Sequence, residues 1–136
     1  MAQLIDSSVF IALERRRLPI GALLSSTDPD EPVAITSITA SELLAGVHRA
    51  DSLERRLRRE AFVERVLETV PVLPFDLRAG RIHAQIWAQL MAEGQIIGAY
   101  DLLNAAIALA QGYDILTDNV REFQRVPGLR VRQPQW

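Results

Sequence analysis

The feature that most limits what this chain can fold into is the alternation of short apolar runs with longer helical patterns. The apolar runs are bounded by Pro, Gly, Asp or Ser, as buried strands are, and they lie at 4–5, 33–35, 70–73, 115–116 and 129–131. The helical patterns lie between them, at 8–16, 40–50, 53–68, 76–93 and 101–111. This order predicts an α/β layer architecture with a mostly parallel sheet.

Helix faces and helix ends are visible inside these patterns. Apolar residues recur every fourth position at 82, 86 and 90, and again at 53, 57 and 61, which is the spacing of one helix face. Gly94 and Gly112 each stand just after a helical pattern, where glycine commonly ends a helix. The polar loop at 25–32 is too short to separate domains, so we expect a single domain, 1–136.

The residue types that are missing exclude several kinds of chemistry. The chain has no cysteine, and its 15 basic residues are all arginine. This excludes disulfides, thiolate nucleophiles, Schiff bases and phosphate-binding loops that need a lysine. The two histidines, His48 and His83, are too few for a multi-histidine metal site, and we expect both to be surface or packing residues. The formal net charge is −2, so any contact with nucleic acid needs a local basic patch.

Nothing in the sequence resembles a targeting segment or an apolar span of about 20 residues. We therefore expect a cytoplasmic protein that does not contact the membrane.

Four acidic residues stand near the points where predicted strands end or helices begin: Asp6, Glu42, Asp101 and Asp118. Each has a structural explanation. Asp6 can cap the helix that follows it, and Glu42 can reach back to the Thr39 amide in a capping box. The dipole of the following helix can stabilise the negative charge of Asp101, and Asp118 can form a turn.

Taken together, the same four acids suggest a shared site. The ligand crevice of an open α/β sheet lies beyond the carboxyl ends of its strands. Carboxylates gathered there repel one another unless a cation compensates them. A set of ligands made only of oxygen, without Cys or paired His, favours Mg²⁺ or Mn²⁺ over zinc. The chemistry indicated is metal-assisted hydrolysis of a phosphodiester without a covalent intermediate.

Four blocks of the sequence, in order along the whole chain, resemble the PIN-domain nucleases, and most of all the VapC toxins of toxin–antitoxin pairs. The blocks are Leu4–Ile11, Ser37–Gly46, Gly98–Ala106 and Leu116–Phe123, the last followed by Val126–Leu129. The resemblance implies a PIN-like three-layer fold, in which a central sheet is flanked by helices.

The resemblance also implies roles for particular residues. Asp6, Glu42 and Asp101 match the family's three main acids, as catalytic residues and metal ligands. Asn119 stands where the family usually has a fourth acid or an Asn, and Asp118 is its neighbour, so either residue is a candidate to complete the site. The hydroxyls of Ser8 and Thr117 are expected to hydrogen-bond the carboxylates or bound water, because such outer contacts orient metal ligands.

Two arginine clusters, at 15–17 and between 49 and 65, are candidate RNA contacts. Arg15, Arg49 and Arg56 are the side chains that we assign to a phosphate-binding rim, because a guanidinium can grip phosphate with two hydrogen bonds. The alternatives are a cation cluster at a helix C-terminus for Arg15 and a solvated helix face for the others.

The function implied by the resemblance is that of a Mg²⁺-dependent endoribonuclease, with Mn²⁺ as a possible substitute. Such an enzyme acts as a toxin on tRNA or ribosomal RNA, leaves 5′-phosphate and 3′-hydroxyl ends, forms a homodimer and is inhibited by a VapB-like antitoxin. We expect the antitoxin to bind in a groove over residues 40–68. The alternative is a PIN-fold module that binds RNA or protein with weak or no catalysis. Trp87, Tyr100 and Trp136 are expected to serve in packing.

Overall fold

The structure is a computed structural model that describes residues 2–135, so the expectation for Trp136 lies outside it. The strands are β1 (Gln3–Ile5), β2 (Val33–Thr36), β3 (Val72–Leu73), β4 (Asp114–Leu116) and β5 (Val131–Arg132). The helices are α1 (Ser7–Arg15), α2 (Ile20–Ser26), α3 (Ser37–His48), α4 (Leu53–Thr69), α5 (Leu77–Ala92), α6 (Ala99–Gln111) and α7 (Val120–Phe123).

The five strands form one sheet in the order β3-β2-β1-β4-β5, and every neighbouring pair is parallel. The predicted α/β fold with a mostly parallel sheet is confirmed. Strand β1 lies at the centre, with Leu4 beside Ala34 on one side and beside Ile115 on the other. Because the strands are parallel, β1, β2 and β4 all end at the same edge of the sheet.

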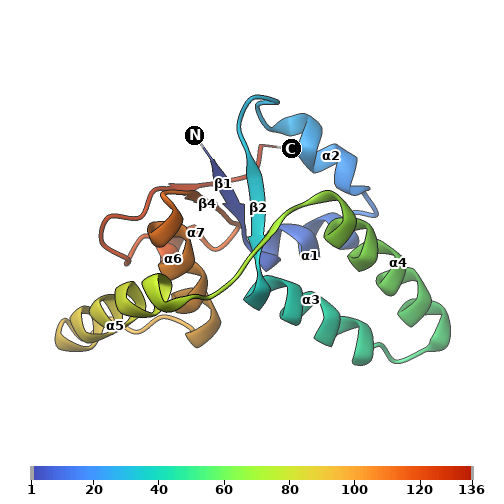
Figure 1. Ribbon diagram of the computed structural model, residues 1–136. Coiled ribbons are helices and arrows are strands. Elements are labelled where there is room, and N and C mark those ends of the chain that lie inside the picture. Colours follow the sequence, from blue (N-terminus) through green and yellow to red (C-terminus); the bar gives the residue numbers. More distant parts are fainter. Residues whose placement is uncertain (1, 136) are drawn as a thin grey trace.

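Helices cover both faces of the sheet (Figure 1). Alternate strand residues point to opposite faces. Ile5, Ile35 and Leu116 pack with α1 to α4, whereas Leu4, Ala34 and Ile115 pack with α5, α6 and α7. These are the three layers that the resemblance implied. Within residues 2–135, no helix is long and apolar enough to cross a membrane.

Besides small shifts in the bounds of some elements, the structure differs from the prediction in two short helices and in the start of α3. Helices α2 and α7 were not predicted, because they have only seven and four residues and give little periodic pattern. Helix α3 begins at Ser37, three residues earlier than expected, so the predicted capping box is wrong. The residue that caps α3 is Thr36, whose side chain accepts a hydrogen bond from the Thr39 amide at 2.9 Å.

Several large apolar side chains lie at the surface rather than in the core. Leu53 and Leu57, which share the apolar face predicted for α4, are 72% and 57% exposed. Trp87 and Tyr100 are 53% and 57% exposed, so the expectation that they serve in packing is wrong. The helices that carry them lie on opposite sides of the molecule, α4 on one and α5 and α6 on the other (Figure 1).

Candidate active site

Asp6 is the buried centre of the site. It follows β1 directly and is 3% exposed. Its Oδ2 atom accepts hydrogen bonds from the Ser8 hydroxyl at 2.7 Å, from the Thr117 hydroxyl at 2.9 Å and from the Ser8 amide at 3.4 Å. Its Oδ1 atom is buried and has no hydrogen-bond partner among the described residues. One carboxylate oxygen is therefore fixed, and the other is left available to a ligand.

Glu42 approaches Asp6 from α3. Since α3 begins at Ser37, Glu42 lies in its second turn rather than its first. Its Oε1 atom is also buried without a hydrogen-bond partner in the described part of the chain. Burial and the charge of Asp6 raise the pKa of Glu42, while a hydrogen bond from Ser7 and the charge of Arg49 act against the rise. The ionised form of Glu42 is thus short of compensating positive charge.

Asp101 lies in the first turn of α6 and is the most perturbed carboxyl group of the site. Its pKa is raised from 3.8 to about 8 by burial, by a hydrogen bond with Glu122 and by the negative charges of Asp6, Glu122 and Glu42. These effects show that the charges of Asp6 and Glu42 act on Asp101. Burial, rather than any single charge, is the largest cause of this rise.

Glu122 is the residue that the sequence interpretation missed. It accepts hydrogen bonds from the Gly98 amide and from the Asn119 side chain, the latter at 2.6 Å. Burial acts to raise its pKa, but the hydrogen bonds from Gly98, Asp101 and Asn119 outweigh it, and the pKa is lowered. Asp101 and Glu122 are therefore joined by a hydrogen bond, in which Asp101 carries the proton and Glu122 accepts it. An acid three residues after Asn119, in the first turn of the unpredicted α7, was the available signal.

The two candidates for the fourth position differ in where they lie. The side-chain amide of Asn119 donates to Glu122 and, at 3.4 Å, to Asp101, so Asn119 is part of the cluster. Asp118 is exposed, and its described contact is made by its backbone amide, which donates to the Ser8 hydroxyl at 3.1 Å. The structure thus brings Asn119 to the carboxylates, together with Ser8 and Thr117.

The chemistry of the donors, rather than an assembled set of ligands, suits a divalent cation. Among residues 2–135, no group of three or more His, Cys, Asp or Glu side chains is arranged so that it could hold a metal ion. Two buried carboxylate oxygens nevertheless lack partners, on Asp6 and Glu42, and Asp101 and Glu122 hold a proton where a cation would offset their charge. Oxygen donors of this kind suit Mg²⁺ or Mn²⁺.

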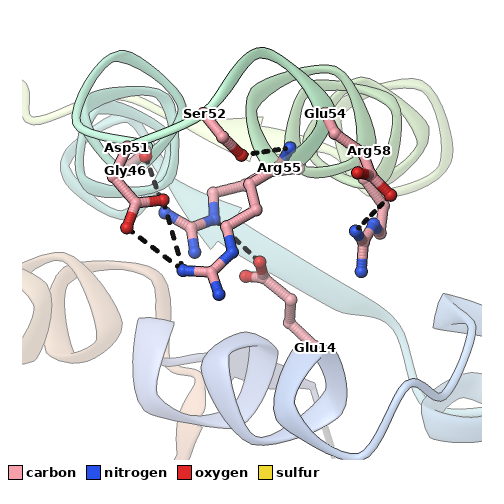
Figure 2. Close-up of polar contacts among 8 residues, drawn as sticks. Glu14, Gly46, Asp51, Ser52, Glu54, Arg55 and Arg58 are labelled. Atoms are coloured by element: carbon pink, nitrogen blue, oxygen red, sulfur yellow. Dashed lines mark hydrogen bonds and ion pairs between the residues drawn. The ribbon is translucent and has the colours of Figure 1, made fainter.

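The predicted arginines are divided between two places. Arg15 and Arg49 line a hollow of about 590 Å³ that opens on Glu42. Arg56 is not among its lining residues, and its guanidinium lies 3.4 Å from the His48 ring. A residue not predicted, Arg59, closes one side of this hollow by bonding Glu14 of α1 at 2.7 Å and the Gly46 carbonyl of α3 at 2.9 Å. Figure 2 shows these contacts between α4, α3 and α1.

Comparison with known proteins shows the family to which the chain belongs. The PIN domain family model matches residues 4–129. "Ribonuclease VapC1" of Rickettsia felis is 35% identical over 96% of this chain and 95% of its own. "tRNA(fMet)-specific endonuclease VapC" of Salmonella typhimurium is 37% identical over 73% of each chain. A crystal structure of VapBC-5 from Mycobacterium tuberculosis, a member of the VapBC family of toxin–antitoxin systems, superposes with a TM-score of 0.76, at 31% identity over 99% of this chain and 98% of the other. The chain therefore belongs to the PIN domain family and, within it, to the VapC ribonucleases.

Proposed function

We propose that this protein is a Mg²⁺-dependent endoribonuclease and the toxin of a toxin–antitoxin pair. The observation that supports the proposal is the electrostatic interaction of Asp6, Glu42 and Asp101, which come from three separate elements of the fold. Two buried carboxylate oxygens, Asp6 Oδ1 and Glu42 Oε1, have no partner within residues 2–135. Buried oxygens of this kind usually have a partner, and a cation supplies one here.

Asp6, Glu42 and Asp101 would hold the cation, and Asn119 and Glu122 would support it. A divalent ion at this position lowers the pKa of water and offsets the charge that develops on a phosphodiester. Mn²⁺ meets the same requirements with the same donors.

The chain's own residues prepare this chemistry. The hydroxyls of Ser8 and Thr117 fix the orientation of the Asp6 carboxylate through Oδ2. Oδ1 can therefore bind a cation without a rotation of the carboxylate. Asp101 must lose the proton that it shares with Glu122 before it can act as a ligand. Asn119 holds Glu122 at 2.6 Å, which keeps a second carboxylate next to Asp101.

The proposed substrate is RNA, cut to leave 5′-phosphate and 3′-hydroxyl ends. Arg15 and Arg49 line the hollow that opens on Glu42, so they are placed to bind phosphates next to the cut. The Salmonella relative is named for its action on tRNA(fMet), and we extend the class, tRNA, to this chain. Ribosomal RNA is the second substrate class to be tested.

The proposed partners are an antitoxin of the VapB kind and a second copy of this chain. The arm formed by α3 and α4, residues 37–69, borders the site and leaves Leu53 and Leu57 exposed, as a groove for a partner segment requires. On the opposite side, a mostly apolar hollow of about 520 Å³ is lined by Trp87, Met91 and Ile96 among others. Trp87, Met91 and Ile96 are all exposed, and a cluster of exposed apolar side chains supports a homodimer through that side.

The test is to map RNA 5′ ends in cells after the protein is induced, for the wild type and for Asp101→Ala. Discrete new ends in the wild type that are missing in the variant are the expected result, with Asp118→Asn as a matched control that still cleaves. Purified protein should cut the same RNA with Mg²⁺ and stop cutting when EDTA is added. Equal growth inhibition by the wild type and Asp6→Asn, without new RNA ends, would instead identify a binding module.

A further inference from the structure

The position of Asp101 depends on where α6 begins, and Gly98 sets that point. Gly98 is the N-cap of this helix, and no side chain within residues 2–135 caps it there. The Gly98 carbonyl accepts the first helical hydrogen bond, from the Leu102 amide at 2.9 Å. A Cβ atom at Gly98 would lie 3.5 Å from both Asp101 Oδ2 and Glu122 Oε1. A shift of Gly98 would therefore move the helix turn that carries Asp101.

Two side chains from the segment at the end of α7 hold the backbone that leads into α6. Arg125 Nη1 donates a hydrogen bond to the Ile96 carbonyl at 2.7 Å. Glu122 accepts a hydrogen bond from the Gly98 amide. The backbone on either side of Ile97 is therefore bound, through the carbonyl before it and the amide after it.

Ile97 lies between these two contacts and is buried. Its side chain is 8% exposed and belongs to the same buried cluster as Phe123 and Val126. Ile96, by contrast, is 80% exposed. Apolar packing has no preferred direction, whereas hydrogen bonds do. The two hydrogen bonds therefore decide how the backbone of residues 96–98 is oriented.

Arg125 and Glu122 act from one turn of the chain. The Arg125 amide donates to the Glu122 carbonyl at 3.2 Å, which extends the last turn of α7. Residues three positions apart on such a turn lie on one side of it. Burial raises the pKa of Glu122, but its hydrogen bonds and the charge of Arg125 lower it. Arg125 thus also stabilises the carboxylate that accepts from Gly98.

We propose that Arg125 is a positioning residue for RNA cleavage. It holds the Ile96 carbonyl, and through residues 96–98 it fixes the first turn of α6 and with it Asp101. The contact uses one N–H donor, so lysine can replace arginine here. At a phosphate gripped by two parallel hydrogen bonds, lysine is a poor substitute. The inference rests on the proposed function, in which Asp101 binds the cation.

The test compares Arg125→Met, which keeps the apolar part of the side chain, with Arg125→Lys, which restores one donor. The first measurement is hydrogen exchange by NMR, on protein without metal or RNA. The Leu102 amide should exchange roughly tenfold faster in Arg125→Met, because the first turn of α6 opens more often. It should stay within about threefold of the wild type in Arg125→Lys. The Ile115 amide in β4 should exchange equally in all three proteins.

The second measurement is cleavage of mixed tRNA at a fixed Mg²⁺ concentration. In Arg125→Met, kcat should fall roughly tenfold while KM stays within about twofold, because a metal ligand moves and the RNA contacts remain. Calorimetric titration should give a Kd for Mg²⁺ that is higher by a similar factor. Arg125→Lys should recover most of the loss in both quantities.

The matched control is Arg121→Met, which removes the same charge from an exposed position of α7 and should leave Leu102 exchange and the Kd for Mg²⁺ unchanged. Equal effects of Arg121→Met and Arg125→Met would reduce the role to local charge and overturn the inference. A higher KM in Arg125→Met, with kcat and Leu102 exchange unchanged, would assign Arg125 to RNA binding and also overturn it.

Faster exchange of Ile115 together with Leu102 in Arg125→Met would mark a general loss of stability, which likewise overturns the inference. These outcomes leave Mg²⁺ binding and cleavage by the wild type intact. A wild type that neither binds Mg²⁺ nor cuts RNA would instead overturn the proposed function, and the role of Arg125 in cleavage with it.

Discussion

The hydroxyl of Thr36 donates a hydrogen bond to the side-chain carbonyl of Asn104 at 2.5 Å, across 68 residues of sequence, and both side chains are 0% exposed. Thr36 also caps α3, the helix of Glu42, and Asn104 lies one turn after Asp101 on α6. This bond therefore fixes the helix that carries one site carboxylate against the helix that carries another.

Replacing Asn104 with Ala should lower the free energy of unfolding by about 1 to 3 kcal/mol, because the buried Thr36 hydroxyl loses its acceptor. Urea unfolding of Asn104→Ala, Thr36→Val and the double variant measures the coupling between the two side chains. We expect the double variant to lose less than the sum of the single losses. Simple additivity would mean that the bond contributes no coupling.

Without metal, the protein should become less stable as the pH rises from about 4 to about 8. The pKa of Asp101 is raised from 3.8 to about 8 in the folded state, so over this range the unfolded chain binds fewer protons than the folded one. The free energy of unfolding then falls with pH, and the stabilisation present below about pH 4 is lost by about pH 8.

Asp101→Asn tests this directly, since an amide can still donate to Glu122 but does not titrate. Urea unfolding in EDTA should give a shallower pH dependence for Asp101→Asn than for the wild type. The raised pKa of Glu42 acts in the same direction and remains in the variant. Identical slopes for the two proteins would contradict the assignment of the proton to Asp101.

Mg²⁺ should raise the melting temperature of the wild type and not that of Asp6→Asn. A ligand that binds only the folded state stabilises it by about 2.7 kcal/mol when its concentration is 100 times Kd. Differential scanning calorimetry with and without MgCl₂ provides the measurement. Asp118→Asn, whose side chain is exposed, should respond as the wild type does. A metal response that survives in Asp6→Asn would place the cation elsewhere.

Glu122→Gln should reduce RNA cleavage by about tenfold or more, because outer carboxylates support metal ligands. Glutamine keeps the size of the side chain but removes the charge that Gly98, Asn119 and Asp101 surround. The steady-state rates of RNA cleavage by Glu122→Gln and by Asp118→Asn show which of these two acids supports cleavage. The opposite ranking, with Asp118→Asn the more damaged variant, would return the fourth position to Asp118.

Arg59→Gln should destabilise the protein by about 1 to 3 kcal/mol, since it removes the donor to Glu14 and to the Gly46 carbonyl. Arg58→Gln is the control, because the Arg58–Glu54 pair is exposed and such pairs contribute about 0 to 1 kcal/mol. Thermal or urea unfolding gives both values, and similar losses for the two variants would contradict a specific role for Arg59.

The sequence was informative where a local pattern decides the structure. The parallel sheet followed from short apolar runs between helical patterns, and Asp6 could be predicted at the end of β1 because a buried strand must stop at a polar residue. Glu42 and Asp101 were singled out because they stand near the starts of predicted helices, and the order of the four blocks supports them. The structure places all three where their charges interact.

The features that could not be predicted from the sequence depend on contacts between distant segments. Glu122 gains its role from the Gly98 amide, 24 residues away, and Arg59 gains its role from Glu14, 45 residues away. The helix α7 that carries Glu122 is too short to have a periodic signature. Thr36 was missed as the cap of α3 because Thr39 offered an equally good local pattern, and the bond to Asn104 that favours Thr36 is not visible in the sequence.

The central position of β1 means that the site draws on residues from both ends of the described chain. Asp6 emerges early during synthesis, but Thr117, Asn119 and Glu122 follow more than a hundred residues later. A nascent polypeptide still short of residue 117 thus has Asp6 and Ser8 but lacks Thr117, Asn119 and Glu122. The candidate site is therefore incomplete until the segment that carries Thr117, Asn119 and Glu122 has been translated.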